Sequence, residues 1–427
     1  MAADLHHVLV IGAGFGGISI TRGLQDAPVR VTLVDANNFH TFQPLLYQVA
    51  TAGLDVADVA HPIRNIFPGR RRSLVKVVVG EVTAIDPGAR TVDLHDGRQL
   101  DYDILVVAAG AVTADFGVPG VAEHAFPLKS VDDAVALRLH LLRQFEHADA
   151  SAEPIEAGAL DVVISGGGPT GVEMAGGIAE LYSMVLSDDF PDLPVAEARI
   201  VLVEPQARVL APFHPDSSEH ATEQLRKMGV DVRTGVGIAE VTPDGVTLSD
   251  GERVLARTVV WAAGVRANPL ATLLGVELGR AGRIPVEQDL TVAGLPDVFA
   301  IGDIAATTGS DGALLPQVAQ PAIQGGAHVA RQIRRRLAGE PTEPFRYVDK
   351  GSMATIGRHS AVTELANGRR FDGFVGWLAW LGLHLVYLMG FRNRISVFVN
   401  WSWNYLTYDR ANRLLSRRDL EERPEVP

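Results

Sequence analysis

The sequence contains no cysteine among its 427 residues. This absence excludes disulfide bonds, thiolate metal sites, iron–sulfur clusters held by cysteine, and redox-active cysteine pairs. Any redox chemistry would therefore depend on a bound cofactor, with the protein supplying binding and orientation. The sequence also predicts no metal site.

Positive charge is scarce as well, because 38 lysine and arginine residues stand against 51 acidic residues, a formal net charge of −13. An acidic chain is a poor partner for nucleic acid, and we expect none to bind. The first predicted strand begins near His6, so we expect no signal or transit peptide. The length predicts two or three domains, and 47% hydrophobic with 21% charged residues is typical of a globular protein.

The opening of the chain predicts a phosphate-binding turn. Apolar residues from Val8 lead into glycines with the G-x-G-x-x-G spacing, at Gly12, Gly14 and Gly17. The apolar residues favour a buried strand, the first glycine permits a tight turn, the second lets backbone approach a pyrophosphate, and the third lets the next helix pack closely. A helix over residues 15–24 would then direct its first N–H groups at the phosphates.

An acidic residue completes this unit. A second strand, over residues 30–34, ends at Asp35, where a carboxylate can bind a ribose 2′-hydroxyl. The order of strand, glycines, helix, strand and acid favours a dinucleotide site over a glycine-rich turn that binds nothing.

The same pattern returns in the middle of the chain. A strand from Asp161 leads into a second glycine motif with Gly166, Gly168 and Gly171, and a later strand ends at Glu204. Two further apolar segments, 104–110 and 258–264, have similar sequences, and both end in Ala-Ala-Gly. The chain therefore contains two copies of one nucleotide-binding plan, with the second nested within the first.

The first plan resumes near Arg283. Residues 298–303 predict a strand that ends in Gly302 and Asp303, where ligands bind in open α/β sheets. Glutamines then recur at three- and four-residue spacing within a stretch leading to a helix through Arg336, and they could line one helix face: Gln317, Gln320 and Gln324. The alternative is ordinary polarity at a helix N-terminus.

The C-terminal part differs in composition from about Phe345 onward. Residues 374–391 form an 18-residue run without a charged side chain, and four of the five tryptophans lie in this part. Between residues 369 and 418 eight arginines stand against two acidic residues, a local charge of +6. A basic, tryptophan-rich, apolar segment is typical of attachment to a membrane surface. The run reaches the minimum length for spanning, but three glycines and His384 weigh against it, and a buried core helix is a further alternative.

With these features placed, nearly the whole chain resembles the type II NADH dehydrogenases, which are single-subunit, FAD-containing, membrane-attached NADH:quinone oxidoreductases. The resemblance rests most on residues 12–17, 42–51, 319–325, 350–357 and 391–394. It implies an α/β fold with two Rossmann-like, glutathione-reductase-like dinucleotide domains plus C-terminal membrane-attachment helices. The expected ranges are 1–115 and 285–345 for FAD, 116–284 for NADH, and 346–427 for membrane association.

The resemblance also implies individual site residues. The first glycine motif, Asp35 and Asp303 would hold FAD, and the second motif, Glu173 and Glu204 would serve NADH. The full set of implied cofactor-binding residues is Gly12, Ala13, Gly14, Phe15, Gly16, Gly17, Asp35, Ala36, Gln43, Val82, Ala109, Gly110, Gly168, Pro169, Thr170, Gly171, Glu173, Glu204, Ala263, Gly264, Gly302, Asp303, Gln317, Ala319 and Gln320. The implied catalytic residues are Glu173, Gln317 and Gln320, and those near the quinone are Gln320, Gln324, His384 and Tyr387.

The implied reaction passes hydride from NADH to N5 of FAD and then two electrons to a membrane quinone of the respiratory chain. No transmembrane proton path is visible in the sequence, so we expect no proton pumping. The expected location is the cytoplasmic side of the cell membrane, as a peripheral protein. The sequence leaves the oligomeric state open, and a homodimer is one assembly that it allows.

Two other functions fit parts of the sequence. A soluble FAD-dependent NAD(P)H reductase of an electron-transfer protein shares both nucleotide units but does not need the basic, tryptophan-rich C-terminal part. A flavin-based redox sensor would bind NADH without turnover. Glu204 predicts a preference for NADH over NADPH, because a carboxylate repels the 2′-phosphate of NADPH. Arg208, four residues further on, could instead bind that phosphate and allow NADPH to be used.

Overall fold

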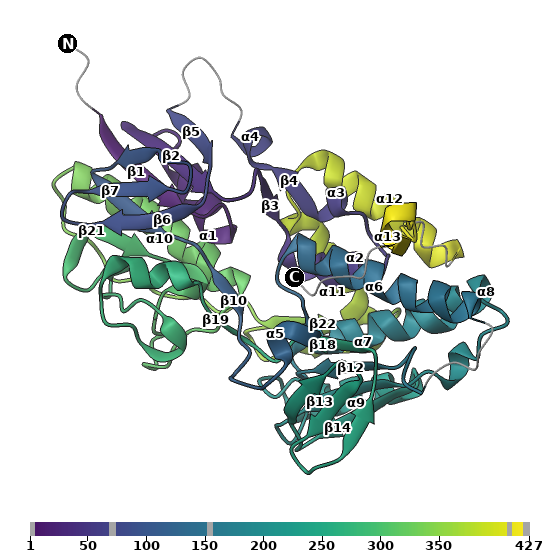
Figure 1. The fold of residues 1–427 in the computed structure, drawn as a ribbon. Helices are drawn as coiled ribbons and strands as arrows, with labels where there is room; N and C mark the ends of the chain where they lie inside the picture. Colours follow the sequence, from purple (N-terminus) through teal and green to yellow (C-terminus); the bar gives the residue numbers. More distant parts are fainter. Residues whose placement is uncertain (1–4, 68–73, 152–156, 408–411, 422–427) are drawn as a thin grey trace. The chain divides into compact units, whose positions relative to one another are not determined.

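The structure is a computed structural model that describes residues 5–67, 74–151, 157–407 and 412–421 (Figure 1). The chain forms two compact units. The first comprises Met1–His40, His61–Val112 and Val265–Asp349, and the second comprises Thr41–Ala60, Thr113–Gly264 and Lys350–Pro427. Each unit holds one largely parallel sheet, so the prediction of two nested dinucleotide-binding folds is confirmed.

The sheet of the first unit follows the order β20-β21-β9-β1-β2-β5, and all its pairings are parallel except that of β20 with β21. Its central strands are continuous runs of valine, leucine and isoleucine that are buried on both faces, as expected for a parallel sheet. The strands are β1 His6–Ile11, β2 Val29–Asp35, β5 Val75–Val79, β9 Ile104–Val107, β20 Thr291–Val292 and β21 Leu295–Ala300.

Two helices of this unit cross at glycines. Helix α1 spans Phe15–Leu24, as predicted, and packs against α10, Ala319–Leu337. A Cβ at Gly326 would lie 2.5 Å from the carbonyl oxygen of Gly16, so only glycine permits this approach. The crossing fixes the helix that follows the first glycine motif.

A small antiparallel sheet completes the first unit. It is formed by β6 Val82–Asp86, β7 Thr91–Leu94 and β8 Gln99–Asp101. Gly80 and Glu81 separate β6 from β5, which ends at Val79. The short elements are β3 Phe39–Thr41, β4 Ala60–Pro62, α4 Ile63–Ile66, β10 Ala111–Thr113 and β19 Val265–Ala267.

The second unit contains the parallel sheet β11-β18-β12-β13-β14. Its strands are β11 Phe126–Pro127, β12 Val162–Ser165, β13 Ile200–Glu204, β14 Val230–Thr234 and β18 Thr258–Trp261. Its helices are α2 Leu46–Ala50, α3 Val56–Val59, α5 Val121–His124, α6 Val131–Ala150, α7 Pro169–Leu181, α8 Ser187–Asp189 and α9 Pro215–Lys227. An antiparallel sheet is formed by β15 Ile238–Thr242, β16 Gly245–Leu248 and β17 Arg253–Leu255.

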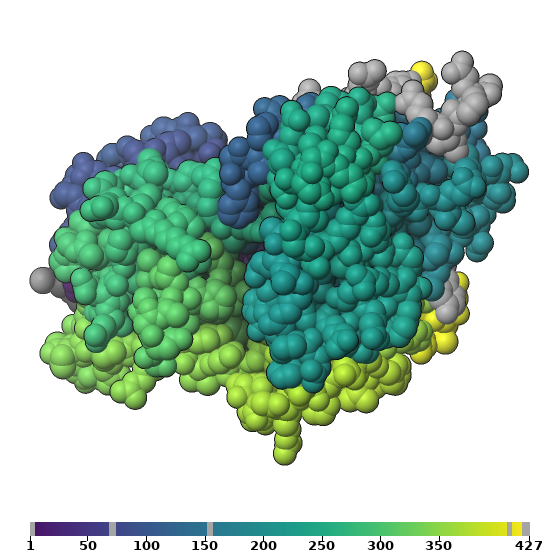
Figure 2. Space-filling model, turned by 90° about the horizontal axis from the view of Figure 1, so that it is seen from below, coloured from purple at the N-terminus to yellow at the C-terminus, as the bar shows by residue number. Residues whose placement is uncertain are grey.

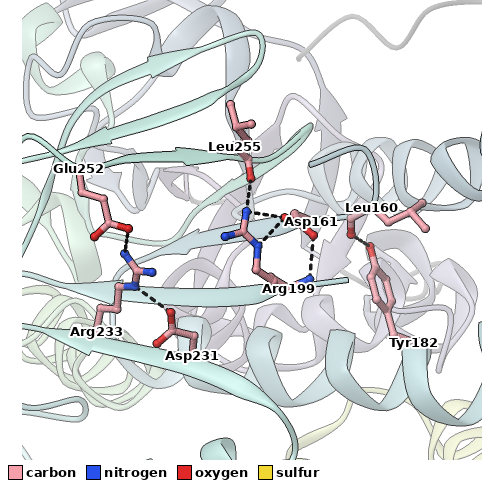
Figure 3. Close-up of polar contacts among 8 residues, drawn as sticks. All are labelled: Leu160, Asp161, Tyr182, Arg199, Asp231, Arg233, Glu252 and Leu255. Carbon is pink, nitrogen blue, oxygen red and sulfur yellow. Dashed lines mark hydrogen bonds and ion pairs between the residues drawn. The ribbon is translucent and has the colours of Figure 1, made fainter. Parts of the chain in front are cut away.

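Ion pairs fasten the amino ends of two strands in this unit (Figure 3). Asp161 precedes β12, and both of its oxygens accept hydrogen bonds from Arg199, which precedes β13, at 2.8 Å. Arg199 also donates to the carbonyl oxygen of Leu255 on β17. Ligands of parallel sheets bind at the opposite, carboxyl ends, so this cluster serves the fold rather than a nucleotide.

The compact units differ from the predicted ranges in several places, and residues 350–427, expected to form a separate region, belong to the second unit. Residues 265–284 fall in the first unit, because Ala267, Ala271 and Leu274 are buried in its core. Residues 41–60 fall in the second unit, where α2 packs against α6 and α7.

The C-terminal part of the second unit is a small sheet followed by helices. The sheet contains β22 Ser352–Thr355, β23 Ala361–Glu364 and β24 Arg370–Phe371, and the helices are α11 Gly373–Tyr387, α12 Phe391–Thr407 and α13 Arg417–Glu421. Helix α11 packs on β23 and α12 lies beside α3 (Figure 1). In Figure 2 the yellow-green C-terminal segment lies directly against the teal part of the same unit. Among the described residues no helix is both long and apolar enough to cross a membrane.

Candidate cofactor sites and C-terminal helices

The first glycine motif forms an open cradle at the carboxyl end of β1. Gly12 has φ +99°, and a Cβ there would lie 2.4 Å from the carbonyl oxygen of Ala108. A Cβ at Gly17 would lie 1.7 Å from the oxygen of Gly12, so the fold itself requires both glycines. At Gly14, by contrast, no described atom lies within 4 Å of a Cβ position. The space above Gly14 fits a pyrophosphate that meets backbone alone.

Asp35 closes this cradle, which we call the first cradle (Gly12–Gly17 with Asp35). Its carboxylate accepts hydrogen bonds from the backbone N–H groups of Ala13, at 2.6 Å, and Asn37, at 2.7 Å. Burial raises the pKa of Asp35 and the two N–H groups oppose the rise. The carboxylate is therefore held at the end of β2 beside the glycine turn, where a ribose would lie.

His40 supports the first cradle, and no pattern in the sequence indicated it. Its Nδ1 lies 2.8 Å from the carbonyl oxygen of Ala13, and its ring meets Phe15 edge-on at 5.2 Å. Burial lowers the pKa of His40 to about 4, so the imidazole is neutral at physiological pH. A neutral ring that donates to Ala13 fixes the turn without adding charge near a phosphate.

The second glycine motif repeats this geometry in the other unit. Gly166 has φ +103° and a Cβ there would lie 2.5 Å from the carbonyl oxygen of Ala262, while one at Gly171 would lie 1.8 Å from the oxygen of Gly166. No described atom lies within 4 Å of a Cβ at Gly168. We call Gly166–Gly171 with Glu204 the second cradle. It fits a second pyrophosphate by the same criterion.

Glu204 takes the place of Asp35 in the second cradle. Its carboxylate, 6% exposed, accepts hydrogen bonds from the backbone N–H of Gly167, at 2.6 Å, and of Gln206, at 2.8 Å. The two units therefore position an acid in the same way, although one carries aspartate and the other glutamate.

Arg208 is engaged within its own loop. Its guanidinium donates to the carbonyl oxygens of Phe213, at 2.8 Å, and Ala211, at 2.7 Å. A guanidinium that holds two carbonyl groups shapes the loop after β13. These contacts argue against the reading of Arg208 as a ligand for a 2′-phosphate.

Asp303 and Gln317 lie together in the first unit. Asp303 follows β21 in a 3-10 turn, Gly302–Ile304, and Gln317 donates from Nε2 to its backbone oxygen at 2.8 Å. The prediction that three glutamines share one helix face is wrong, because α10 begins at Ala319 and Gln317 precedes it. Gln320 and Gln324 do lie on the helix, 3.4 Å apart, and Gln324 exchanges two hydrogen bonds with the backbone of Val348.

The remaining predicted cofactor residues fall at strand ends or loops. Ala36 follows β2, Val82 begins β6, Ala109 and Gly110 follow β9, and Ala263 and Gly264 follow β18. Gln43 belongs to the second unit, where its side chain accepts a hydrogen bond from Lys129 at 3.2 Å. Contacts of these residues with a cofactor stay predictions.

Glu173 is buried on α7 beneath the C-terminal part of its unit. Its carboxyl group lies 3.4 Å from the backbone N–H of Thr355 on β22. Burial raises the pKa of Glu173 to about 8, and the Thr355 N–H and the indole N–H of Trp380 only partly oppose the rise. The indole nitrogen faces the carboxyl without meeting the geometry of a hydrogen bond, and it has no such partner among the described residues. Glu173 is therefore a protonated acid near pH 7.

His384 and Tyr387 lie on α11, which also carries Trp380. The His384 ring stacks on Trp380 at 4.0 Å, and its Nδ1 lies 2.8 Å from the Trp380 carbonyl oxygen. Burial lowers the pKa of His384 to about 4, so its ring is neutral. Tyr387 accepts a hydrogen bond from Lys350 at 3.3 Å. The structure thus brings His384 close to Glu173 through Trp380, a link that the sequence did not indicate.

Helix α12 presents its polar side to the protein. Asp58, which is buried on α3, accepts hydrogen bonds from Ser396, at 2.6 Å, and Asn400, at 2.8 Å. Asn393 donates to the Asp58 backbone oxygen at 3.3 Å, and Asn404 to that of Gly53 at 3.0 Å. These residues recur at helical spacing and form one inward polar stripe.

The opposite face of α12 is apolar and exposed. Its outer residues are between 48% and 77% exposed: Phe391, Ile395, Phe398, Val399, Trp403 and Leu406. A water-soluble helix turns its apolar stripe inward, so α12 has the reverse polarity. Such a face fits an apolar phase outside the protein.

Two arginines of this region make contacts with other parts of the second unit. Arg394 donates to the carbonyl oxygens of Val386 and Leu388 at the end of α11, and Arg413 pairs with Asp189 at 2.8 Å. Arg410 and Asp409, which were counted in the local charge, lie outside the described residues. Asp189 lies outside the range 369–418, so its ion pair with Arg413 offsets one of the positive charges counted there.

Comparison with known proteins places this fold in a class. Residues 6–326 match the family described as pyridine nucleotide-disulphide oxidoreductase, and residues 350–408 match the family described as NDH2 C-terminal domain. A solved structure of NDH2 from Plasmodium falciparum in complex with RYL-552 matches 96% of this chain and 100% of its own, with a TM-score of 0.87 and 19% identity. The class is thus that of flavoproteins with two dinucleotide-binding folds.

Sequence comparison narrows the class to a family. The chain is 41% identical over 442 residues to the type II NADH:quinone oxidoreductase Ndh of Mycobacterium tuberculosis, covering 99% of this chain and 94% of the relative. It is 35% identical to the type II NADH:quinone oxidoreductase of Staphylococcus aureus, covering 85% and 90%. The chain belongs to the type II NADH:quinone oxidoreductases. The resemblance drawn from the motifs is confirmed.

Proposed function

We propose that this chain oxidises NADH through bound FAD and reduces a membrane quinone without pumping protons. The observation that carries the proposal is that one chain holds two cradles of equal geometry, each closed by its own acid, together with a helix of reversed polarity. The match to the NDH2 C-terminal domain favours quinone over a soluble electron-transfer protein as the acceptor. The test is NADH oxidation by the purified protein with a short-chain quinone, compared with a soluble electron-transfer protein, as the acceptor.

The first cradle is assigned to FAD. Its glycine backbone would bind the pyrophosphate, Asp35 the ribose, and Asp303 with Gln317 the part of the cofactor beyond the phosphates. When bound, FAD accepts hydride from NADH and passes two electrons onward. The residues of this unit would hold and orient the cofactor largely through backbone groups.

Paired glycine variants test the two assignments. Gly14→Val should leave the fold intact, because φ is ordinary and the site is open, but the side chain would fill the pyrophosphate space. We expect FAD released by heating the purified protein to fall at least about tenfold. Gly168→Val, in the matching position of the second cradle, should retain FAD and lose NADH binding. Equal FAD content in both variants would contradict the assignment.

The second cradle is assigned to NADH, with Glu204 as the selector against NADPH. A carboxylate facing a 2′-phosphate costs several kcal/mol, so kcat/KM should favour NADH by at least about tenfold. Glu204→Ala should narrow this ratio, whereas Arg208→Ala should leave it unchanged and lower thermal stability. Glu240→Ala, at an exposed acid of the same unit, serves as the control. A native ratio near one would count against Glu204.

Glu173 is proposed as the proton-handling residue at the nicotinamide face. It is buried, neutral near pH 7 and linked through Trp380 to His384. Gln317 and Gln320 of the first unit are proposed to lie beside the flavin, and Gln320, Gln324, His384 and Tyr387 to meet the quinone. An acid with a pKa near the working pH suits proton transfer to a reduced acceptor.

The outer face of α12 is proposed to attach the protein to the cytoplasmic side of the membrane. Its polar stripe is bound to α3, so the apolar residues face outward as a fixed surface. Burying them contributes roughly 25 cal/mol per Å². Because this apolar face supplies most of the binding and Arg413 is already paired with Asp189, we expect high salt to weaken attachment only slightly. A homodimer stays a prediction.

A further inference from the structure

An exposed aromatic ring lies beside the second cradle, and the fold does not account for it. Phe116 is 66% exposed, whereas Val118 and Val121, which follow it, pack in the core of the same unit. A single exposed aromatic residue is common at protein surfaces. The backbone conformation of Phe116, with a positive φ, is uncommon for an aromatic residue.

Phe116 occupies a turn position that disfavours its side chain. The N–H of Val118 donates to the carbonyl oxygen of Asp115 at 3.1 Å, and both central residues have positive φ, +53° for Phe116 and +71° for Gly117. Turns with two positive φ values favour asparagine or glycine, because a Cβ is strained there. Strain of this kind persists where the surrounding structure requires it, often at functional sites.

The ring lies beside Gly264 at the end of β18. A Cβ at Gly264 would lie 2.9 Å from Cζ of Phe116, so a side chain there would push the ring aside. The connecting segment is fastened on both sides, because Ala114 donates to the Gly264 oxygen at 3.1 Å and accepts from Trp261 Nε1 at 2.8 Å. These contacts fasten the segment that carries Phe116 to the end of β18.

That place lies on one side of the second cradle. A Cβ at Gly166 would lie 2.7 Å from Cα of Ala263, the residue before Gly264, so the glycine turn and the end of β18 adjoin. Strand β18 flanks β12 opposite β13, which carries Glu204. In such sheets one nucleotide lies over the strand with the ribose-binding acid and the other lies across the switch point. Phe116 is therefore on the nicotinamide side.

We propose that Phe116 is a positioning residue that stacks on the nicotinamide half of the dinucleotide. The inference rests on the proposed assignment of the second cradle to NADH and adds a residue that none of the motifs indicated. A flat aromatic amide fits against an exposed phenyl ring. The strained turn directs the ring toward the end of β18, and the absence of a side chain at Gly264 leaves space beside it.

The test separates the ring from the turn. Phe116→Asn removes the ring and supplies a residue that the turn favours, and Phe116→Tyr keeps the ring. Calorimetry on the FAD-loaded, full-length protein would compare NAD⁺ with ADP-ribose, which lacks the nicotinamide. In Phe116→Asn we expect the Kd of NAD⁺ to rise roughly two- to tenfold, that of ADP-ribose to stay the same, and Tm to stay the same or rise. Phe116→Tyr should match the native protein.

Each other outcome overturns the inference. An unchanged Kd for NAD⁺ means that the ring does not touch the nicotinamide, and equal losses for NAD⁺ and ADP-ribose, or a lower Tm, mean that the ring is structural. Ala281→Gly, at an exposed residue with φ +56° in the first unit, controls for relief of strain and should change neither Kd. If Gly168→Val binds both ligands normally, the cradle assignment fails, which is distinct from failure of Phe116 alone.

Discussion

Replacing Glu173 by glutamine is expected to reduce quinone turnover roughly 100-fold at about pH 7, with FAD content unchanged. The carboxyl group is buried with its pKa raised to about 8, so it holds a proton near neutral pH and can exchange it. Glutamine keeps the contact with the Thr355 N–H but cannot transfer a proton. The measurement is kcat as a function of pH, where the native protein should show a limb near pH 8 that the variant lacks.

The control for this prediction is a second buried acid on the same helix. Glu180 lies two turns further along α7 and accepts a hydrogen bond from the backbone N–H of Arg358. Glu180→Gln keeps that acceptor and should retain the native pH profile. A limb near pH 8 that survives in Glu173→Gln would assign the titration to another group.

The same residue makes stability depend on pH. Below about 4.5 the side chain is protonated in both the folded and the unfolded chain, and above about 8 it is ionised in both. Between these values unfolding releases a proton, so the free energy of unfolding falls as pH rises, by about 1.4 kcal/mol per pH unit. Glu173→Gln should lack this decline, and thermal unfolding across the window would show the difference.

The second large effect concerns membrane attachment. The double variant Phe398→Glu and Trp403→Glu places charges on the outer face of α12, where the native side chains are 57% and 58% exposed. Each buried apolar side chain contributes about 1.5–3 kcal/mol, so partition into vesicles should fall roughly 100-fold or more. The fold should survive, because the inward polar stripe is untouched. Co-sedimentation with vesicles containing anionic lipid is the measurement.

Activity separates attachment from catalysis in this variant. Turnover with a long-chain quinone in vesicles should fall in parallel with binding, while turnover with a small hydrophilic acceptor should persist. Leu255→Glu, an exposed apolar position on β17, is the control and should sediment like the native protein. If the double variant sediments with vesicles as well as the native protein, α12 does not attach the protein to the membrane.

The cradles could be predicted from the sequence because their determinants are local. Gly12 to Gly17 and Gly166 to Gly171 carry their spacing within a few residues, and Asp35 and Glu204 end the next strands. The pKa of Glu173 could not be predicted, because Thr355 and Trp380, which surround it, come from far along the chain. Its place near a helix N-terminus alone would have favoured the ionised form.

The glutamines and α12 show that helical spacing alone does not tell where a helix begins or which of its faces is buried. The spacing of Gln317, Gln320 and Gln324 is helical, but the helix starts only at Ala319, and the pattern does not say so. The polar residues of α12 also repeat at helical spacing, yet which face is inward depends on Asp58, more than 300 residues earlier. Periodicity identifies the residues that share a helix face, but not the part of the protein that the face contacts.

One turnover experiment tests the central claim most directly. Purified full-length protein would oxidise NADH in the presence of a short-chain quinone or of a soluble electron-transfer protein such as a ferredoxin. We expect steady turnover with the quinone, loss of that turnover in Gly14→Val, and little reduction of the soluble protein. Turnover with the soluble protein in place of the quinone, or no turnover from FAD-loaded protein, would contradict the account.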